Sequence, residues 1–98
     1  MKLAIFLDSL DFEDIAMNII KVLMFDVDDK VILSIGEETL SLNNTGYLMM
    51  LLISNDIITV YADNISDKQI ELFRQAGIEH KALRELKGNP IFRSFLID

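Results

Sequence analysis

The chain has 98 residues, contains no cysteine and carries a formal net charge of −7. This length supports one domain, and the lack of cysteine excludes disulfides, thiolate catalysis and cysteine-ligated metal centres. The acidic charge disfavours bulk attraction to nucleic acid or to an anionic membrane. We expect neither as a partner, and we expect a cytoplasmic location because no signal peptide or membrane-length apolar run is visible.

The first third of the chain predicts three strands. Residues 3–7 are continuously apolar, which is typical of a strand buried on both faces. Residues 19–25 and 31–35 are rich in β-branched and apolar side chains and flank an acidic turn, so they predict a β-hairpin. A helical spacing of apolar residues over 12–23 is the alternative for part of this region. Gly36 is expected to end the second hairpin strand.

The remaining chain alternates helices and strands. Asn43 and Asn44 indicate a helix start, and residues 47–54 have almost no polar face, so that helix is expected to be buried in the domain or in an oligomer interface. Residues 57–62 are the clearest strand. A capping box of Ser66 and Gln69 begins a helix that ends at Gly77. Residues 78–83 predict a parallel strand, and Asn89-Pro90 a last helix.

This order predicts the fold class. Strand–helix–strand units joined by short loops imply parallel pairing with right-handed crossovers, whereas the hairpin adds antiparallel strands at one side. We therefore expect a single-domain α/β fold over residues 1–98, with a mixed sheet of about five strands and flanking helices.

Two groups of polar residues follow predicted strands. Carboxylates cluster after the first strand, and they could hold a divalent ion, although helix capping and a solvated loop are the favoured interpretation: Asp8, Asp11, Glu13 and Asp14. Asp63, Asn64 and Ser66 join the clearest strand to the best-marked helix. A helix start can bind an anion, but a turn-and-cap role is favoured because no glycine allows close approach.

Two further motifs have simpler alternatives. Four basic residues close in sequence could form an anion patch, although a solvated strand end and loop is favoured: His80, Lys81, Arg84 and Lys87. Asp26 and Asp28 resemble the D-x-D that follows an apolar strand in haloacid dehalogenase-type phosphatases. The Gly-Thr that continues that pattern is absent here, so a polar hairpin turn is the favoured interpretation.

Three stretches together resemble the dinitrogenase iron–molybdenum cofactor biosynthesis family (the NifX-like and NifB-C-terminal-like domains). Residues 1–5 are similar to the family's M-K-I-A-hydrophobic opening strand, and 21–31 to its acidic hairpin. Residues 57–65 and 72–79 are similar to its strand, loop, helix and L-x-x-A-G-I ending. The resemblance implies a ribonuclease H-like fold and a small anionic or metal-containing ligand.

The departures from this family affect the site more than the fold. The family's His-Phe-Gly-Arg-like segment matches residues 14–18 here, and its Gly-Gly-x-Gly-like loop matches residues 62–65. Neither match keeps the glycines or the basic residue, and a net charge of −7 repels an anionic cluster. The resemblance thus supports the fold and argues against direct carry-over of cofactor binding, so we leave the cofactor unassigned.

Three functions follow as hypotheses. The first is a non-enzymatic binding or interaction domain, a divergent relative of that family, whose ligand-binding residues lie at one sheet end: Asp8, Ser9, Asp63, Asn64 and Ser66. The second is a small divalent-metal-dependent enzyme that uses Asp8 with other carboxylates. The third is a structural homo-oligomer, for instance a homodimer, built on the apolar helix 47–53, where Met49 and Met50 suit adaptable contacts.

Overall fold

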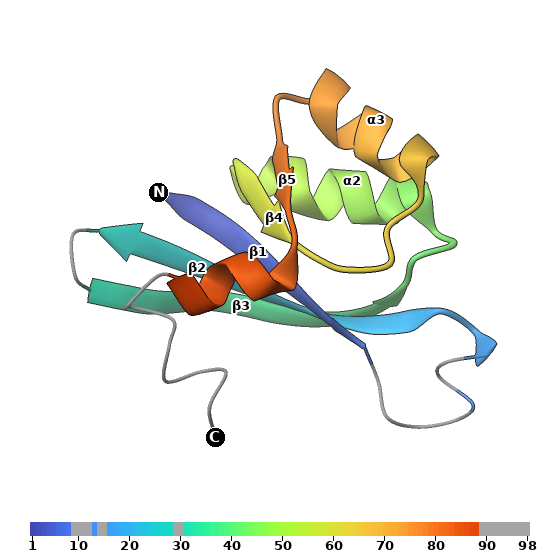
Figure 1. Ribbon diagram of the computed structural model, residues 1–98, viewed down its shortest axis with the longest axis horizontal. Coiled ribbons are helices and arrows are strands. Elements are labelled where there is room, and N and C mark those ends of the chain that lie inside the picture. Colours follow the sequence, from blue (N-terminus) through green and yellow to red (C-terminus); the bar gives the residue numbers. More distant parts are fainter. Residues whose placement is uncertain (9–12, 14–15, 29–30, 89–98) are drawn as a thin grey trace.

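Five strands form one mixed sheet with two helices on one face (Figure 1). The computed structural model describes residues 1–8, 13, 16–28 and 31–88. The elements, in chain order, are β1 Lys2–Asp8, β2 Ile19–Asp28, β3 Val31–Ser41, α2 Thr45–Ser54, β4 Thr59–Tyr61, α3 Asp67–Gln75, β5 Glu79–Lys81 and the 3₁₀ helix η1 Leu83–Gly88. The spatial order is β3-β2-β1-β4-β5. The predicted α/β fold class is confirmed.

The β2–β3 hairpin is longer than the sequence predicted. β2 and β3 pair antiparallel as expected, and β1 and β2 also pair antiparallel. The expectation that Gly36 ends the second strand was wrong, because β3 continues to Ser41. Met24 pairs with Gly36 and Phe25 pairs with Ser34, so Ile35 is an extra residue in a β-bulge. A glycine inside a strand commonly marks such a bulge or a close approach rather than a strand end.

The other half of the sheet is parallel. β4 pairs with β1 and β5 pairs with β4, both in parallel. Both strands are shorter than the predicted strands 57–62 and 78–83. At one end of β4 the cause is local: the Ile57 N–H donates to the Leu52 carbonyl oxygen at 3.0 Å, so Ile57 closes the end of α2.

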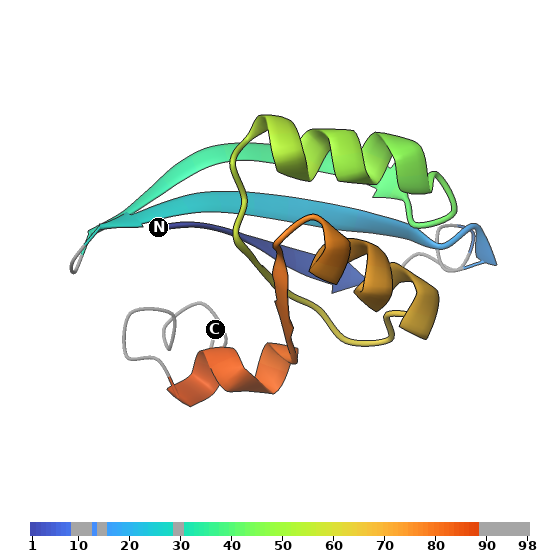
Figure 2. The ribbon, with the colours of Figure 1, turned by 90° about the horizontal axis from the view of Figure 1, so that it is seen from above.

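Alternating side chains of the central strands build a core on each face of the sheet. We call the face under α2 and α3 the helix side; Ala4, Phe6, Val22 and Val60 point to it and pack against Leu48, Leu52 and Phe73. Leu3, Ile5, Phe25 and Tyr61 point to the opposite side and pack against Leu86 of η1. Figure 2 shows the two helices and η1 on opposite sides of the sheet. The buried first strand is thereby explained, because β1 has an apolar layer on both faces.

The helix ends follow the sequence signals. Asn44 caps α2, with its side-chain oxygen accepting from the Tyr47 N–H. Ser66 and Gln69 form the capping box of α3. At the other end of α3, Gly77 has φ +76°, and its N–H donates to the Arg74 carbonyl oxygen. These features confirm the predicted boundaries of both helices within about one residue.

The residues after β5 differ from the sequence prediction. Residues 83–88, expected as strand end and loop, form η1. Its buried Leu86 explains the difference, because a short helical turn brings that side chain onto the apolar face of the sheet. The helix expected after Asn89-Pro90 lies outside the described residues. No helix in the described ranges combines the length and apolarity needed to cross a membrane.

Candidate functional site

The carboxyl ends of β1 and β4 form the topological switch point of the sheet. The two strands are parallel neighbours, but the chain leaves β1 towards β2 and leaves β4 towards α3 and β5. Open α/β sheets place ligands in the crevice outside such strand ends, where successive connections diverge in opposite directions. The sequence-predicted residues Asp8 and Asp63 lie at these two ends.

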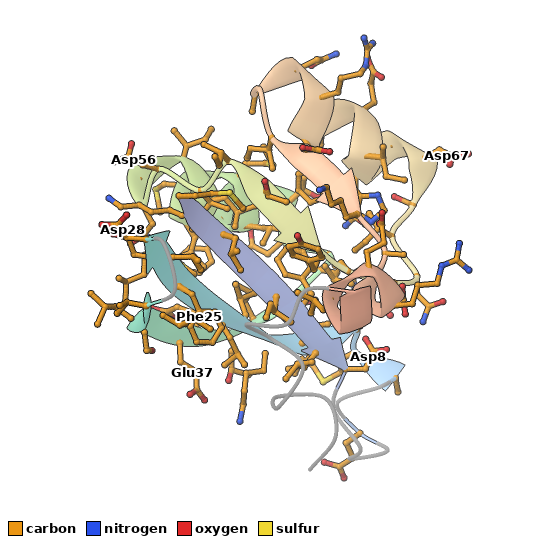
Figure 3. The ribbon with its side chains drawn as sticks, turned by 60° about the vertical axis from the view of Figure 1, so that its left-hand side comes forward. Asp8, Phe25, Asp28, Glu37, Asp56 and Asp67 are labelled. Carbon is orange, nitrogen blue, oxygen red and sulfur yellow. The ribbon has the colours of Figure 1, made fainter. Side chains whose placement is uncertain are left out.

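The two carboxylates nevertheless point to opposite faces of the sheet. Asp8 is exposed and pairs with Ile20 of β2 (Figure 3). It lies on the helix side of the sheet, as Ala4 and Phe6 do. The Asp63 carboxylate lies on the other side, where its Oδ1 accepts from the Leu83 N–H at 3.1 Å at the start of η1. The structure therefore brings these residues to the same end of the sheet, but it does not pair their carboxylates.

The remaining polar groups of the β4–α3 connection serve the connection itself. Asn64 has φ +56°, a left-handed conformation that asparagine tolerates better than most residues. The Ser66 hydroxyl accepts from the Gln69 N–H at 3.2 Å. Gln69 also donates through Nε2 to the Leu42 carbonyl oxygen at 3.0 Å, which ties α3 to the end of β3. These contacts support the turn-and-cap interpretation of this segment.

The acidic cluster after β1 is only partly visible. Ser9, Asp11 and Asp14 lie outside the described residues, and Glu13 is exposed. Within the ranges that the structure describes, no three histidine or acidic side chains gather closely enough to hold a metal ion. The D-x-D pair lies at the end of β2, where Asp26 accepts from the N-terminal amine of Met1 at 3.4 Å and Asp28 is exposed at the hairpin tip.

The basic residues after β4 are used in separate contacts. The Nε2 of His80 lies 2.8 Å from the Ala62 carbonyl oxygen. It donates a hydrogen bond to this oxygen when Nε2 carries the ring proton. Lys81 approaches Glu79 at 3.8 Å and stands 6.0 Å from the Tyr61 ring centre. Arg84 is exposed on η1, and the side chain of Lys87 is not described. The anion patch stays a prediction.

One ion pair carries the resolved electrostatic shifts. Glu71 and Arg74 lie on the exposed side of α3 and form a two-pronged hydrogen-bonded pair. The Arg74 guanidinium lowers the pKa of Glu71, and the Glu71 carboxylate in turn raises the pKa of Arg74. Because both groups are at the surface, this pair indicates local helix stabilisation rather than a catalytic site.

Exposed apolar side chains are the most distinctive surface feature. On α2 only Leu48 and Leu52 are buried, while Tyr47, Met50 and Ile53 are exposed by 37 %, 59 % and 56 %. These three are spaced by three residues and lie along the outer face of the helix, a set that we call the α2 stripe. Leu51, by contrast, packs against the core. The expected burial of this helix is therefore confirmed for its inner face only.

Sequence reasoning missed a second exposed apolar set. Val31 and Leu33 of β3 are exposed by 56 % and 59 %, and Ile35 is exposed as well. The available signal was the uncharged run of residues 31–35 in a strand whose next residues include Glu37 and Glu38. A natural edge strand is usually protected by charges along its length.

The fold is similar to that seen in the crystal structure of PH0822. The TM-score is 0.52, with coverage of 91 % of this chain and 90 % of that chain at 14 % sequence identity. This similarity concerns the fold alone. No model of a known protein family matches the sequence, and no functionally curated protein matches it either.

Proposed function

We propose that this chain is a small non-enzymatic interaction domain that forms a homodimer through the α2 stripe. The supporting observation is that a helix with no charged residue, Thr45–Ser54, presents an exposed apolar stripe on a chain of net charge −7. Depletion of charge and enrichment in aromatic and methionine side chains are typical of interface cores. Scattered single apolar residues need no such explanation, but a stripe along one helix does.

A second copy of the chain is the partner that this stripe suits best. A two-fold interface places the same patch on both subunits, so an acidic patch would repel itself and a neutral one does not. The stripe is also symmetric about Met50. In an antiparallel helix pair, Met50 meets Met50 of the second copy while Tyr47 meets Ile53.

The expected dimer is weak. Half-burying three side chains on each of two copies contributes roughly 5–9 kcal/mol before other terms. Loss of translational and rotational freedom costs at least about 4 kcal/mol of that gain. At most about 5 kcal/mol remains, so we expect a dimer that forms only at protein concentrations near the millimolar range.

Sedimentation velocity with a matched pair of variants tests this proposal. Met50→Lys places a charge at the centre of the stripe, whereas Met17→Lys makes the same change at a methionine that is 61 % exposed elsewhere. We expect the wild type and Met17→Lys to form dimers with rising concentration and Met50→Lys to stay monomeric with an unchanged circular dichroism spectrum. A monomeric wild type at about 1 mM, or equal association of both variants, contradicts the proposal.

Ligand binding at the carboxyl ends of β1 and β4 is a second candidate function. It is supported by the switch point there and by the resemblance to the cofactor-biosynthesis family, of which we propose that the chain is a divergent relative. A metal-dependent enzyme has less support because Asp8 and Asp63, the two carboxylates that the structure describes at these strand ends, point to opposite faces. A thermal shift with Mg²⁺ or Mn²⁺ that Asp8→Asn abolishes would favour the enzyme; no shift in the wild type would contradict it.

A further inference from the structure

The first half of β3 is an unprotected sheet edge. In the part of the chain that the structure describes, β3 has a strand partner on one side only. Residues 31–34 include no charged residue and no proline, although Lys30 precedes them directly, and the bulge at Ile35 begins only after them. Charges, proline and bulges are the usual means by which natural edges avoid pairing with other chains. Here charged residues precede the four-residue stretch and a bulge follows it, but the stretch itself has neither.

The side chains of this stretch are also uncovered on the helix side. Val31 pairs with Asp28 and Leu33 pairs with Asp26, which places both on the same face as Met24 and the helices. Figure 2 shows the β2–β3 hairpin projecting beyond the end of α2, so neither described helix lies over these side chains. An exposed apolar surface therefore lies beside backbone donors and acceptors that pair with no other described strand. Strand addition uses these two features.

Acidic side chains stand at both ends of this stretch. Asp28 is at the hairpin tip, and Glu37 follows the bulge (Figure 3). Glu38 is the next residue of β3. Glu37 is bridged by Lys21 at 3.2 Å across the strand pair. A second copy of β3, paired antiparallel so that Leu33 meets Leu33, would carry its own Glu37 and Glu38 to the tip where Asp28 lies. Residues 28–30 of the tip hold two aspartates and one lysine, so the tip keeps a net negative charge. Like charges brought together across strands are destabilising, so pairing of this edge with its own copy is disfavoured.

We propose that the edge Val31–Ser34 binds an extended segment of a partner protein by strand addition. The geometry and charges point to a partner segment with apolar residues at alternate positions and a lysine or arginine at each end. Its backbone would extend the sheet beyond β3, its apolar side chains would cover Val31 and Leu33, and its basic ends would face Asp28 and Glu38. This site is separate from the α2 stripe, and it does not depend on the dimer proposed above.

A fluorescein-labelled peptide, Lys-Thr-Val-Thr-Ile-Thr-Val-Thr-Lys with blocked ends, is the probe. Fluorescence anisotropy is measured with wild type, Leu33→Lys, Met17→Lys and Met50→Lys. We expect binding to wild type, Met17→Lys and Met50→Lys with equal affinity, and at least about tenfold weaker binding to Leu33→Lys. A peptide with glutamate at both ends should bind at least about tenfold more weakly. One with prolines at two successive central positions should not bind, because one of the two lost N–H groups must face the ladder.

Three outcomes overturn the proposal. One is the absence of peptide binding to wild type at about 1 mM. Another is binding that the Leu33→Lys change or the two successive prolines leave intact, because the edge would then not be the site. The third is self-association that Leu33→Lys abolishes and Met50→Lys does not, which would make a second copy the occupant of this edge. Failure of the α2 dimer alone leaves the peptide result unchanged, so the two proposals are tested separately.

Discussion

Replacing Gly77 by alanine should destabilise the protein, while the same change at Gly46 should stabilise it. Gly77 lies just after α3 with φ +76°. Its N–H donates to the Arg74 carbonyl oxygen, and the next N–H, of Ile78, donates to the Phe73 carbonyl oxygen at 2.8 Å. The same two residues, Phe73 and Ile78, pack together in the core. This is the Schellman arrangement, which requires the left-handed conformation at the glycine.

The magnitude follows from the conformation of each glycine. An L-residue in the left-handed region costs roughly 1–2 kcal/mol, and alanine regains about 0.4–1 kcal/mol by restricting the unfolded chain. A net loss of about 1 kcal/mol is therefore expected for Gly77→Ala, although nothing lies within 4 Å of the added Cβ. Gly46 is in the first turn of α2, also with open space around a Cβ. There alanine should gain about 0.5–1 kcal/mol, because glycine is the poorer helix former.

Thermal and urea denaturation of both variants measure this difference. About 1 kcal/mol corresponds to roughly 4–8 °C in Tm for a domain of this size. We expect Gly77→Ala to melt lower and Gly46→Ala higher than their parent. Both are made in the Met50→Lys background, so that association does not contribute. A Gly77→Ala variant as stable as its parent would refute the assignment of a conformational requirement to this position.

Two other changes test the core and the surface. Phe73→Ala removes a side chain that is 1 % exposed and packs edge-to-face on Phe6, with ring centres 6.2 Å apart. The change should lower the free energy of unfolding, measured by urea titration, by about 3–5 kcal/mol. A loss below about 1 kcal/mol would contradict the described core. Glu71→Gln should lower Tm near neutral pH, because Arg74 lowers the pKa of Glu71. The stabilisation by this pair is complete above the unfolded-state pKa of a glutamate and is lost as pH falls through the lower folded-state pKa. The Tm values of wild type and Glu71→Gln should therefore converge in acid. A Tm difference that persists there would contradict a role of the Glu71 charge.

Local sequence signals predicted the elements that depend on local chemistry. The caps Asn44 and Ser66 and the C′ glycine Gly77 satisfy backbone groups next to them, so their roles are visible in the sequence. The hairpin and the parallel units also followed from apolar runs and connection lengths. What the sequence could not reveal depended on neighbours far along the chain. Gly36 pairs with Met24 next to the bulge, and the Met24 Cε lies 3.0 Å from where a Cβ on Gly36 would be.

The candidate site shows the same division. The sequence predicted that Asp8 and Asp63 lie at one end of the sheet, and in the structure they follow from β1 and β4, which are parallel neighbours. It could not show that Asp63 turns to the Leu83 N–H, because η1 was not expected. Nor could it separate the inner and outer faces of an all-apolar helix: Leu51 and Met50 look equivalent in sequence, but only Met50 is exposed.

A single cysteine introduced at position 50 tests the homodimer most directly. The chain has no cysteine of its own, so Met50→Cys and the control Met17→Cys each carry one thiol. Facing Cα atoms of helices packed at 8–10 Å come within roughly the 4.4–6.8 Å that a disulfide spans. Under mild oxidation we predict a cross-linked dimer for Met50→Cys, formed much faster than for Met17→Cys and suppressed by dilution. Equal and slow cross-linking of the two variants would contradict a dimer built on the α2 stripe.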